Sequence, residues 1–364
     1  MSDVVTPSSE AVVARTAPDT AARLTDDSVA WDAFVAGSPA GSYMQLTAWA
    51  EVKAVNGWDS TRLVVDGLDG AMGAQLLLHD LGRTPWSVGY APRGPVAQAI
   101  SQAGLAAWTA AVRDLAARGH LSHVTIEPQV PVGEGLEAML EASGWRRART
   151  VQDPRTRIID LGRPEAEVWG DLRPKWRQYV NKARRDGVVI VETGEEGIPD
   201  FHRIYVETAQ RAGFVHRAES AYRDVYRAFA ARDAARLLFA RLPGGEPAAA
   251  LLLLHCGRRV IEPYGGMTVA GGESRANYLL KWEAIRSSRE RSFAIYDLWG
   301  VAHPGIEQFK VGFGGQELRY VGAWELVVNP LVHGAAGGAH RIRVALARRS
   351  QGVAGVQRTD GDAT

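Results

Sequence analysis

The chain of 364 residues contains a single cysteine, Cys256, so an internal disulfide framework is excluded. A chain without disulfides suits a reducing compartment. Cys256 follows the apolar run "AALLLLH", which indicates a small buried side chain. No run approaches the ~20 apolar residues that a membrane-spanning helix needs. The N-terminus also lacks the charged-then-apolar pattern of a signal peptide. We therefore expect a cytoplasmic protein.

Several motifs of common enzyme classes are missing as well. The sequence has no P-loop, no G-x-S-x-G elbow and no H-E-x-x-H helix. Its nine histidines show no metal-ligand spacing, and one cysteine cannot supply a thiolate cluster. We expect neither a metal ion nor a bound cofactor.

Acids and bases nearly balance, with a formal net charge of +1, so charged partners must be sought in local patches. One segment of basic residues has no acid until Asp186. At helical spacing its aromatic and small residues form one apolar face, with cations on both sides. This helix is either an ordinary solvated surface or a track for phosphates and a nucleic-acid backbone. Its cations are Arg173, Lys175, Arg177, Lys182, Arg184 and Arg185.

The length exceeds what one hydrophobic core usually holds, and the pattern of elements is repeated. Each half reads as helices, a run of strands, a long helix and a further strand, without similarity between residues. We predict an α/β (α+β) protein with two units, residues 26–161 and 162–316. A late strand in residues 317–345 returns to the first unit. Residues 1–25 and 346–364 are expected to be a disordered leader and tail.

The stretch "GIEQFKVGFGG" places Lys310 between Phe309 and Phe313 in what we interpret as a glycine-rich turn. A lone cation among aromatic residues is unusual, because a solvated lysine would have polar neighbours. In "GYAPRGPV", Arg93 stands before a Gly-Pro bend, where its guanidinium could clamp a phosphate or simply stabilise the turn.

Seven segments, in order, resemble the Fem family of aminoacyl-tRNA-dependent peptidyltransferases (FemX, FemA and FemB), which extend peptidoglycan precursors. The resemblance covers residues 26–330 and is strongest at its C-terminal end. The absence of a long charged helical hairpin matches the short FemX type. The segments are "QLTAWAEVK", "YAPRGPV", "RPKWRQYVNKARRDGV", "GFVHRAESAY", "YGG" followed by "RANYLLKWEAI", "YDLWGV" and "FKVGFGG".

The resemblance implies two tandem acetyltransferase-like (GNAT-like) domains and assigns roles to particular residues. Lys310 would lie in the reaction channel and stabilise the developing oxyanion. Phe309 would stack against the aminoacyl-adenosine end of the tRNA. The basic helix would bind the tRNA itself. The residues of the acceptor channel would be Lys53 and Arg217, which hold a diphosphate, with Tyr90 and Tyr264. We add Arg93 to the acceptor-binding residues because an arginine on a turn at a strand end can bind a phosphate.

The implied reaction moves glycine, alanine or serine from aminoacyl-tRNA, as co-substrate, to a side-chain amine of UDP-MurNAc-pentapeptide or lipid II. We expect a monomer that binds no DNA and can touch the inner face of the membrane. Two departures concern the acceptor: "GPVAQAI" lacks an acid, and Ala221 precedes Tyr222. An aminoacyltransferase making a peptide-like secondary metabolite is therefore an alternative. An acetyl-CoA-dependent N-acetyltransferase is a second one, although neither half has its R-x-x-G-x-G/A loop.

Overall fold

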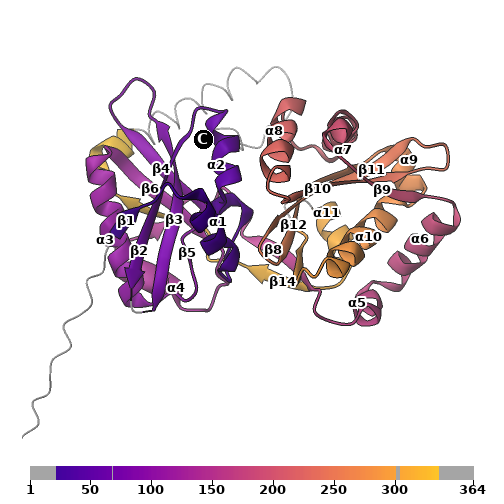
Figure 1. Cartoon of the computed structure of the whole chain (residues 1–364), viewed down its shortest axis with the longest axis horizontal. Helices are drawn as coiled ribbons and strands as arrows, with labels where there is room; N and C mark the ends of the chain where they lie inside the picture. The colour runs from indigo at the N-terminus through magenta and orange to yellow at the C-terminus, as the bar shows by residue number, and fades with distance from the viewer. Residues whose placement is uncertain (1–21, 68, 301–303, 336–364) are drawn as a thin grey trace, which may run out of the picture.

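The computed structural model describes residues 22–67, 69–300 and 304–335. Two α/β units lie side by side, each built around its own twisted sheet (Figure 1). Among the described residues, the first sheet has eight strands, in the order β1-β2-β3-β4-β6-β15-β7 with β5 beside β3. The second has seven, in the order β14-β8-β13-β12-β11-β10-β9.

The strands of the first sheet are β1 (Ala22–Leu24), β2 (Asp59–Gly67), β3 (Gly70–Asp80), β4 (Ser87–Arg93), β5 (Val96–Ala97), β6 (Leu121–Pro128), β7 (Arg146–Arg147) and β15 (Trp324–Val327). Its helices are α1 (Ser28–Gly37), α2 (Thr47–Ala54), α3 (Gln102–Arg118) and α4 (Leu136–Ala142).

The strands of the second sheet are β8 (Arg155–Asp160), β9 (Val189–Thr193), β10 (Ala235–Arg241), β11 (Pro247–Cys256), β12 (Arg259–Met267), β13 (Ile295–Asp297) and β14 (Gln316–Arg319). Its helices are α5 (Glu165–Asp171), α6 (Pro174–Arg185), α7 (Ile198–Ala212), α8 (Glu219–Ala230), α9 (Val269–Glu273), α10 (Ala276–Glu290) and α11 (Pro304–Val311). Within the described residues, every helix is too short or too polar to span a bilayer.

The two sheets repeat one arrangement. In each, a meander of antiparallel strands leads to one parallel pair, β4 with β6 and β12 with β13. Parallel neighbours need a crossover, which α3 supplies in the first unit and α10 in the second. Both helices present apolar residues to their sheet, with Trp108 and Leu279 buried. The repeated pattern of the sequence therefore corresponds to a repeated pattern of packing.

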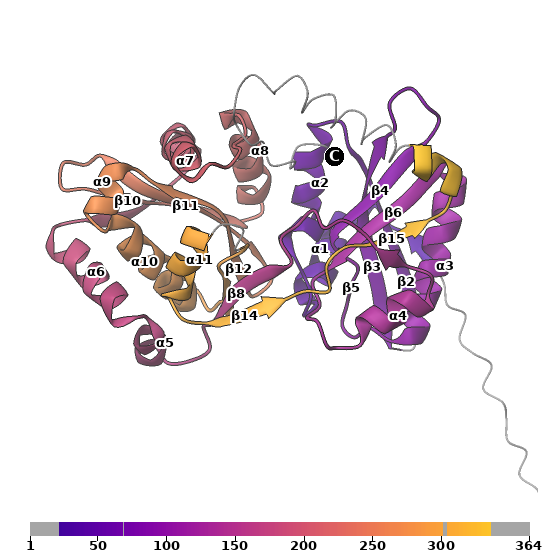
Figure 2. The same ribbon diagram turned by 180° about the vertical axis from the view of Figure 1, so that it is seen from behind.

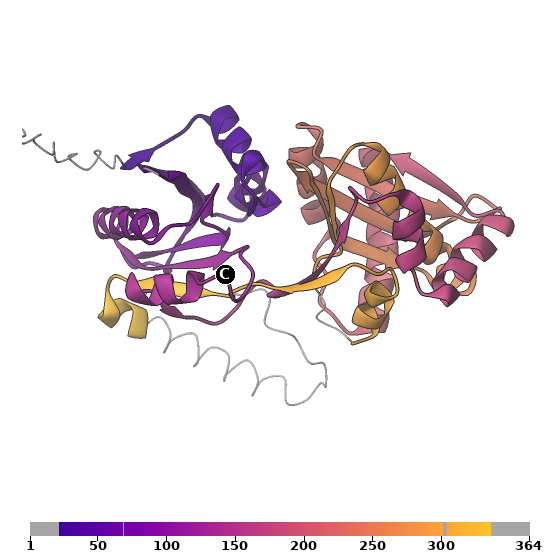
Figure 3. The same cartoon turned by 90° about the horizontal axis from the view of Figure 1, so that it is seen from below.

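The C-terminal segment crosses from the second unit to the first, as Figures 2 and 3 show in yellow. β14 pairs with β8 in the second sheet, and β15 then pairs with β6 and β7 in the first. The predicted return of this region to the first unit is confirmed. The sequence suggested one late strand here, but the chain leaves one sheet and enters the other between Arg319 and Trp324.

Two predicted boundaries differ from the sheets. β8 was included in the first unit, yet it pairs with β13 and β14 in the second sheet. The predicted leader, 1–25, includes β1, which pairs antiparallel with β2 and is held by the Arg23–Asp66 ion pair. An open edge of β2 provides hydrogen-bonding groups that a polar segment can use. Residues 1–21 and the predicted tail, 346–364, lie outside the described residues.

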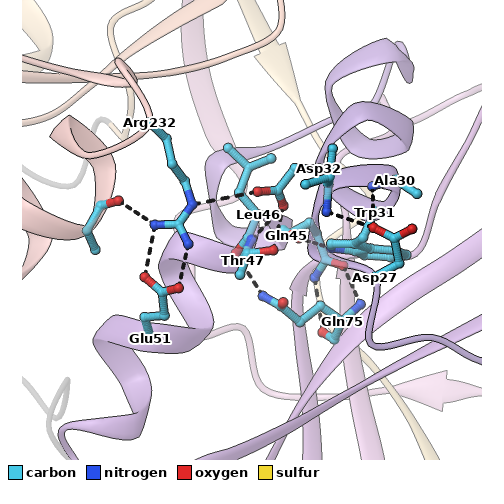
Figure 4. Close-up of polar contacts among 12 residues, drawn as sticks. Asp27, Ala30, Trp31, Asp32, Gln45, Leu46, Thr47, Glu51, Gln75 and Arg232 are labelled. Carbon is cyan, nitrogen blue, oxygen red and sulfur yellow. Dashed lines mark hydrogen bonds and ion pairs between the residues drawn. The ribbon is translucent and has the colours of Figure 1, made fainter.

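The contact between the two units is continuous with the core. Buried residues of α2 and the segment before it pack with α8 in one apolar cluster, where the Tyr43 and Phe229 rings lie 5.9 Å apart. Arg232, just after α8, reaches across to the first unit (Figure 4). It donates to Glu51 at 2.9 Å and lies 3.9 Å from Asp32, whose other oxygen accepts from Thr47 at the start of α2. Helix α2 is therefore held by Arg232 of the second unit and by Asp32 of the first.

Candidate active site

A cavity of about 180 Å³ lies where the two units meet. The structure brings together in it four of the predicted acceptor-channel residues: Lys53, Tyr90, Arg217 and Tyr264. Lys53 comes from α2 of the first unit, and Arg217 comes from the segment before α8 of the second. The remaining lining residues are Tyr43, Met44, Trp49, Pro92, Val151, Gln152, Pro263 and Trp299. Cations from both units and several aromatic rings therefore face one space, a combination suited to an anionic ligand with a flat group.

Further aromatic rings pack against the lining of the cavity. The Tyr264 ring lies 5.3 Å from Tyr222 and 6.1 Å from Tyr205, with both pairs close to perpendicular. Burial raises the pKa of Tyr264, while the nearby Arg217 opposes that shift. The main-chain N–H of Arg217 donates to the hydroxyl of Tyr222 at 3.1 Å. Tyr222, beside the sequence departure at Ala221, thus fixes the backbone that carries Arg217.

An acid that the sequence analysis missed lies directly behind the cavity. Glu127, at the end of β6, is buried and accepts a hydrogen bond from the hydroxyl of Tyr90. It also accepts hydrogen bonds from the main-chain N–H groups of Val151 at 2.7 Å and Gln152 at 3.0 Å. Burial raises the pKa of Glu127 and of Tyr90. The one signal in the sequence is an acid among buried residues in "LSHVTIEP", but its partners are 24 to 37 residues away.

The prediction that Lys310 lies in a glycine-rich turn is wrong. Lys310 lies near the C-terminal end of helix α11. The glycines that suggested a turn follow the helix, where Gly314 and Gly315 have φ of 81° and 73°. Those left-handed conformations suit glycine and end the helix sharply. The Lys310 ammonium is buried and donates to the carbonyl oxygens of Gly300 at 2.6 Å and Trp299 at 3.2 Å.

The environment of Lys310 lowers the pKa of its ammonium from 10.5 to about 8. Burial is the largest cause, and the charge of Lys281 acts in the same direction. Glu262, Asp297 and Asp153 oppose the shift. An ammonium with three donors, two of them used by carbonyls, retains one N–H for a substrate. A poorly solvated cation of this kind can stabilise a developing negative charge strongly.

Trp299 connects Lys310 to the cavity. Its carbonyl accepts from the ammonium, whereas its ring lines the cavity and lies 5.5 Å from the ring of Tyr43. The backbone of Trp299 has φ of 58°, an uncommon conformation for a bulky side chain. It is held there in part by its N–H, which donates to the buried Asp297 at 2.8 Å. Strain supported in this way is typical of functional positions.

Arg93 is not brought into the cavity with the other predicted acceptor residues. It is 2% exposed, and its guanidinium lies 5.0 Å from the rings of both Trp299 and Tyr320. One of its N–H groups donates to the carbonyl of Asp153 at 2.8 Å. The sequence left open whether Arg93 binds a phosphate or has a structural role. The geometry favours the structural role, because the guanidinium of Arg93 packs against the ring of Trp299.

Phe309 begins a row of aromatic rings that leads away from Lys310. Its ring lies 5.1 Å from that of Tyr278 on α10, and Tyr278 lies 5.2 Å from Trp176 and 4.8 Å from Tyr179 on α6. The indole N–H of Trp176 donates to the carbonyl of Phe309 at 3.1 Å. The apolar face predicted for the basic helix therefore packs against the helices that carry Phe309 and Tyr278.

The cations of α6 are less uniform than the sequence suggests. Lys182 pairs with Asp186 one turn later, and Arg184 pairs with Glu283 of α10 at 2.8 Å. Within the described part of the chain, these are the two cations of the helix that pair with a carboxylate. The absence of acids inside the segment therefore overstated its free charge. The other cations of the segment are Lys175, Arg177 and Arg185 on the helix and Arg173 directly before it.

A histidine cluster lies on another part of the first sheet, although the sequence showed no metal-ligand spacing. Ligand atoms of His123, Glu325 and His333 are within 4.8 Å of one another. However, Arg146 donates to Glu325 at 2.8 Å and lies 3.3 Å from His333. The positive charge of the guanidinium would repel a metal cation at this place. We therefore interpret the cluster as a network of ion pairs and hydrogen bonds.

Models of two families match separate parts of the chain. The FemAB family model matches residues 26–138, and an acetyltransferase (GNAT) domain model matches residues 170–311. The lipid II:glycine glycyltransferase of Staphylococcus aureus (strain MRSA252) is 29% identical over 227 residues, 59% of this chain and 54% of that protein. The chain thus spans about half the length of the curated relatives it matches.

Solved structures share the fold. The crystal structure of FemX superposes with a TM-score of 0.79 at 20% identity, covering 86% of this chain and 99% of that one. A tandem GNAT protein from the clavulanic acid biosynthesis pathway gives a TM-score of 0.50 at 14% identity, covering 85% and 99%. The predicted fold class, two tandem GNAT-like units, is confirmed.

Proposed function

Since this chain is a relative of the Fem family in both sequence and fold, we propose that it is an aminoacyltransferase acting on a peptidoglycan precursor. The proposed donor is an aminoacyl-tRNA, and the acceptor is an amine of a nucleotide-linked or lipid-linked muropeptide. The observation that carries the proposal is the buried ammonium of Lys310, which donates to the carbonyl of Trp299, a residue that lines the cavity together with a cation from each unit.

In the proposed reaction, the acceptor amine attacks the carbonyl carbon of the aminoacyl ester. A C–N bond forms, the C–O bond to the ribose breaks, and a proton passes from the amine to the departing ribose oxygen. Negative charge develops on the carbonyl oxygen, and the remaining N–H of Lys310 is the donor that stabilises it. Because Gly300 and Trp299 already hold the ammonium, little reorganisation is needed as that charge appears.

The acceptor is proposed to occupy the cavity between the units. A diphosphate would accept from Lys53 and Arg217, one on each wall, through charge-assisted hydrogen bonds. The aromatic lining would hold the flat or apolar parts of the same molecule. Trp299 would separate the acceptor from Lys310, except at the point where the amine of the acceptor reaches the reaction centre.

The proposal is tested by incubating the protein with mixed aminoacyl-tRNAs and two acceptors, UDP-MurNAc-pentapeptide and lipid II, followed by mass spectrometry of each acceptor. We expect a mass gain equal to one amino-acid residue, with glycine, alanine and serine as the first candidates. The same incubation with acetyl-CoA in place of tRNA is the control. Addition of an acetyl group, or no change with any aminoacyl-tRNA, would refute the proposed function.

A further inference from the structure

A second cavity, of about 320 Å³, lies in the second unit, apart from the cleft between the units. It is formed by the end of α7, the end of β12, the short helix α9 and the start of α10. Its volume is at the lower end of the range for small-molecule sites, large enough for one nucleotide but not for a folded RNA. None of the residues discussed for the acceptor lines it.

The lining combines the groups that a nucleotide needs. Arg211 and Arg275 offer cations for a phosphate, and among the described residues that line the cavity the exposed Glu273 is the one acid. The ring of Tyr278 offers a surface for a base. The side-chain oxygen of Asn277 is buried and has no hydrogen-bond partner among the described residues. An unpartnered acceptor of this kind is costly unless a ligand donates to it.

Arg275 is held in place for such a role. It precedes α10 with φ of 64°, donates to the carbonyl of Gly272 at 2.9 Å, and stacks 4.5 Å from the ring of Tyr179 on α6. Arg211 donates to the carbonyl of Met267 at 2.9 Å and lies 3.6 Å from the carboxylate of Glu207, one turn earlier on α7. A guanidinium has five N–H donors, so each arginine keeps donors for a ligand after these bonds.

Through Tyr278, the cavity adjoins the two parts of the protein proposed to contact RNA, which are the basic helix α6 and the pair Phe309 and Lys310. Tyr278 contacts Trp176 and Tyr179 on the basic helix α6, and it also contacts Phe309. Phe309 adjoins Lys310 in the chain. An RNA strand lying along α6 could thus enter the cavity and end at Lys310. In Figure 1, α6 and α10 lie next to each other, with α9 at the end of α10.

We propose that this cavity binds the nucleotide next to the acylated 3′ end of the RNA donor, with its base on Tyr278 and its phosphate on Arg211 and Arg275. This inference rests on the proposed function, because it assumes an RNA donor. It adds a site: Phe309 would take the terminal adenosine, and Tyr278, the next ring in the row, would take its neighbour. Recognition by stacking and phosphate contacts suits a single-stranded end.

The test measures binding of two unacylated RNA minihelices by fluorescence anisotropy. One has a single-stranded CCA 3′ end, and the other lacks those three nucleotides. The wild-type protein should bind the first more tightly. Arg275→Ala and Arg211→Ala should each weaken binding of the CCA-ended RNA about tenfold, the loss expected for one charge-assisted contact. Neither should alter binding of the trimmed RNA. Arg211 is exposed and lies at a helix end, so its variant tests the site even if Arg275→Ala destabilises α10.

Arg203→Ala is the matched control, since Arg203 is also exposed on α7, pairs with Asp200 and lies outside the cavity. It should bind both RNAs as the wild type does. Equal losses for both RNAs, or no loss in either cavity variant, would overturn this inference and leave the proposed function standing. Displacement of the CCA-ended RNA by acetyl-CoA, reduced in Arg275→Ala, would assign the cavity to a coenzyme. Failure of the wild type to bind either RNA would overturn the proposed function as well.

Discussion

Replacement of Lys310 by methionine should reduce catalysis and stabilise the fold at the same time. A pKa lowered from 10.5 to about 8 means that burying this ammonium costs roughly 3 kcal/mol at neutral pH. Methionine keeps the bulk and removes that cost. The carbonyls of Trp299 and Gly300 lose their donor, at about 1 kcal/mol each. The free energy of unfolding should therefore rise by on the order of 1 kcal/mol, measured by urea denaturation.

Turnover of the same variant should fall roughly 100- to 1,000-fold, the range measured for removal of one oxyanion donor. Dissociation constants for either substrate should change little, because the charge develops mainly in the transition state. Lys310→Arg should restore activity only in part, since a planar fork does not occupy the place of an ammonium. Normal turnover in the methionine variant would refute the catalytic role. A stability loss of several kcal/mol would instead show that Lys310 is structural.

The pH dependence tests the same residue without confusion from the acceptor. The acceptor amine must be neutral, so its titration affects wild type and variant alike. The ratio of wild-type to Lys310→Met turnover should fall as the pH rises through about 8, because the charged lysine is lost there. Stability shows the opposite trend. Between about pH 8 and 10.5 the unfolded chain binds more protons than the native one, so wild-type stability increases with pH and the variant's does not. A pH-independent ratio would contradict the assignment.

Three further outcomes are expected. Alanine at Lys53 or Arg217 should raise the Michaelis constant for the acceptor far more than for tRNA, and a larger change for tRNA would reverse the two sites. The double variant Lys175→Ala, Arg185→Ala on α6 should make tRNA binding less sensitive to salt. The slope of the logarithm of the binding constant against the logarithm of salt concentration should change by about one for each phosphate that is no longer neutralised. An unchanged slope would make α6 a solvated surface. Arg232→Ala should lower the free energy of unfolding by about 1 kcal/mol in thermal or urea unfolding, because the partly exposed ion pairs of Arg232 with Glu51 and Asp32 join the two units. No change would show that the apolar packing between the units suffices.

Much of the fold could be predicted because its signals are local. The apolar run "AALLLLH" lies within β11, and the long helix expected in the first half corresponds to α3. The split of the late segment into β14 and β15 could not be seen, because both parts have strand composition and only their partners differ. Likewise, β8 adjoins the first unit in sequence but pairs with strands more than a hundred residues later.

The site was predicted less completely for the same reason. Lys53, Tyr90, Arg217 and Tyr264 were assigned through a resemblance, and the structure places them around one cavity. Glu127 was missed because its role depends on Tyr90 and on main-chain groups from distant segments. The glycines after Lys310 obscured a helix, since the residues that end a helix look like those of a turn. The second cavity has no motif at all, because four elements contribute to it.

The proposed reaction depends on a donor that is an aminoacyl ester of RNA. Transfer of a radiolabelled amino acid from purified aminoacyl-tRNA to a muropeptide acceptor is followed with and without prior ribonuclease treatment. We expect ribonuclease to abolish transfer and acetyl-CoA neither to replace nor to stimulate the donor. Transfer that survives ribonuclease, or acceptor acetylation that depends on acetyl-CoA, would contradict it.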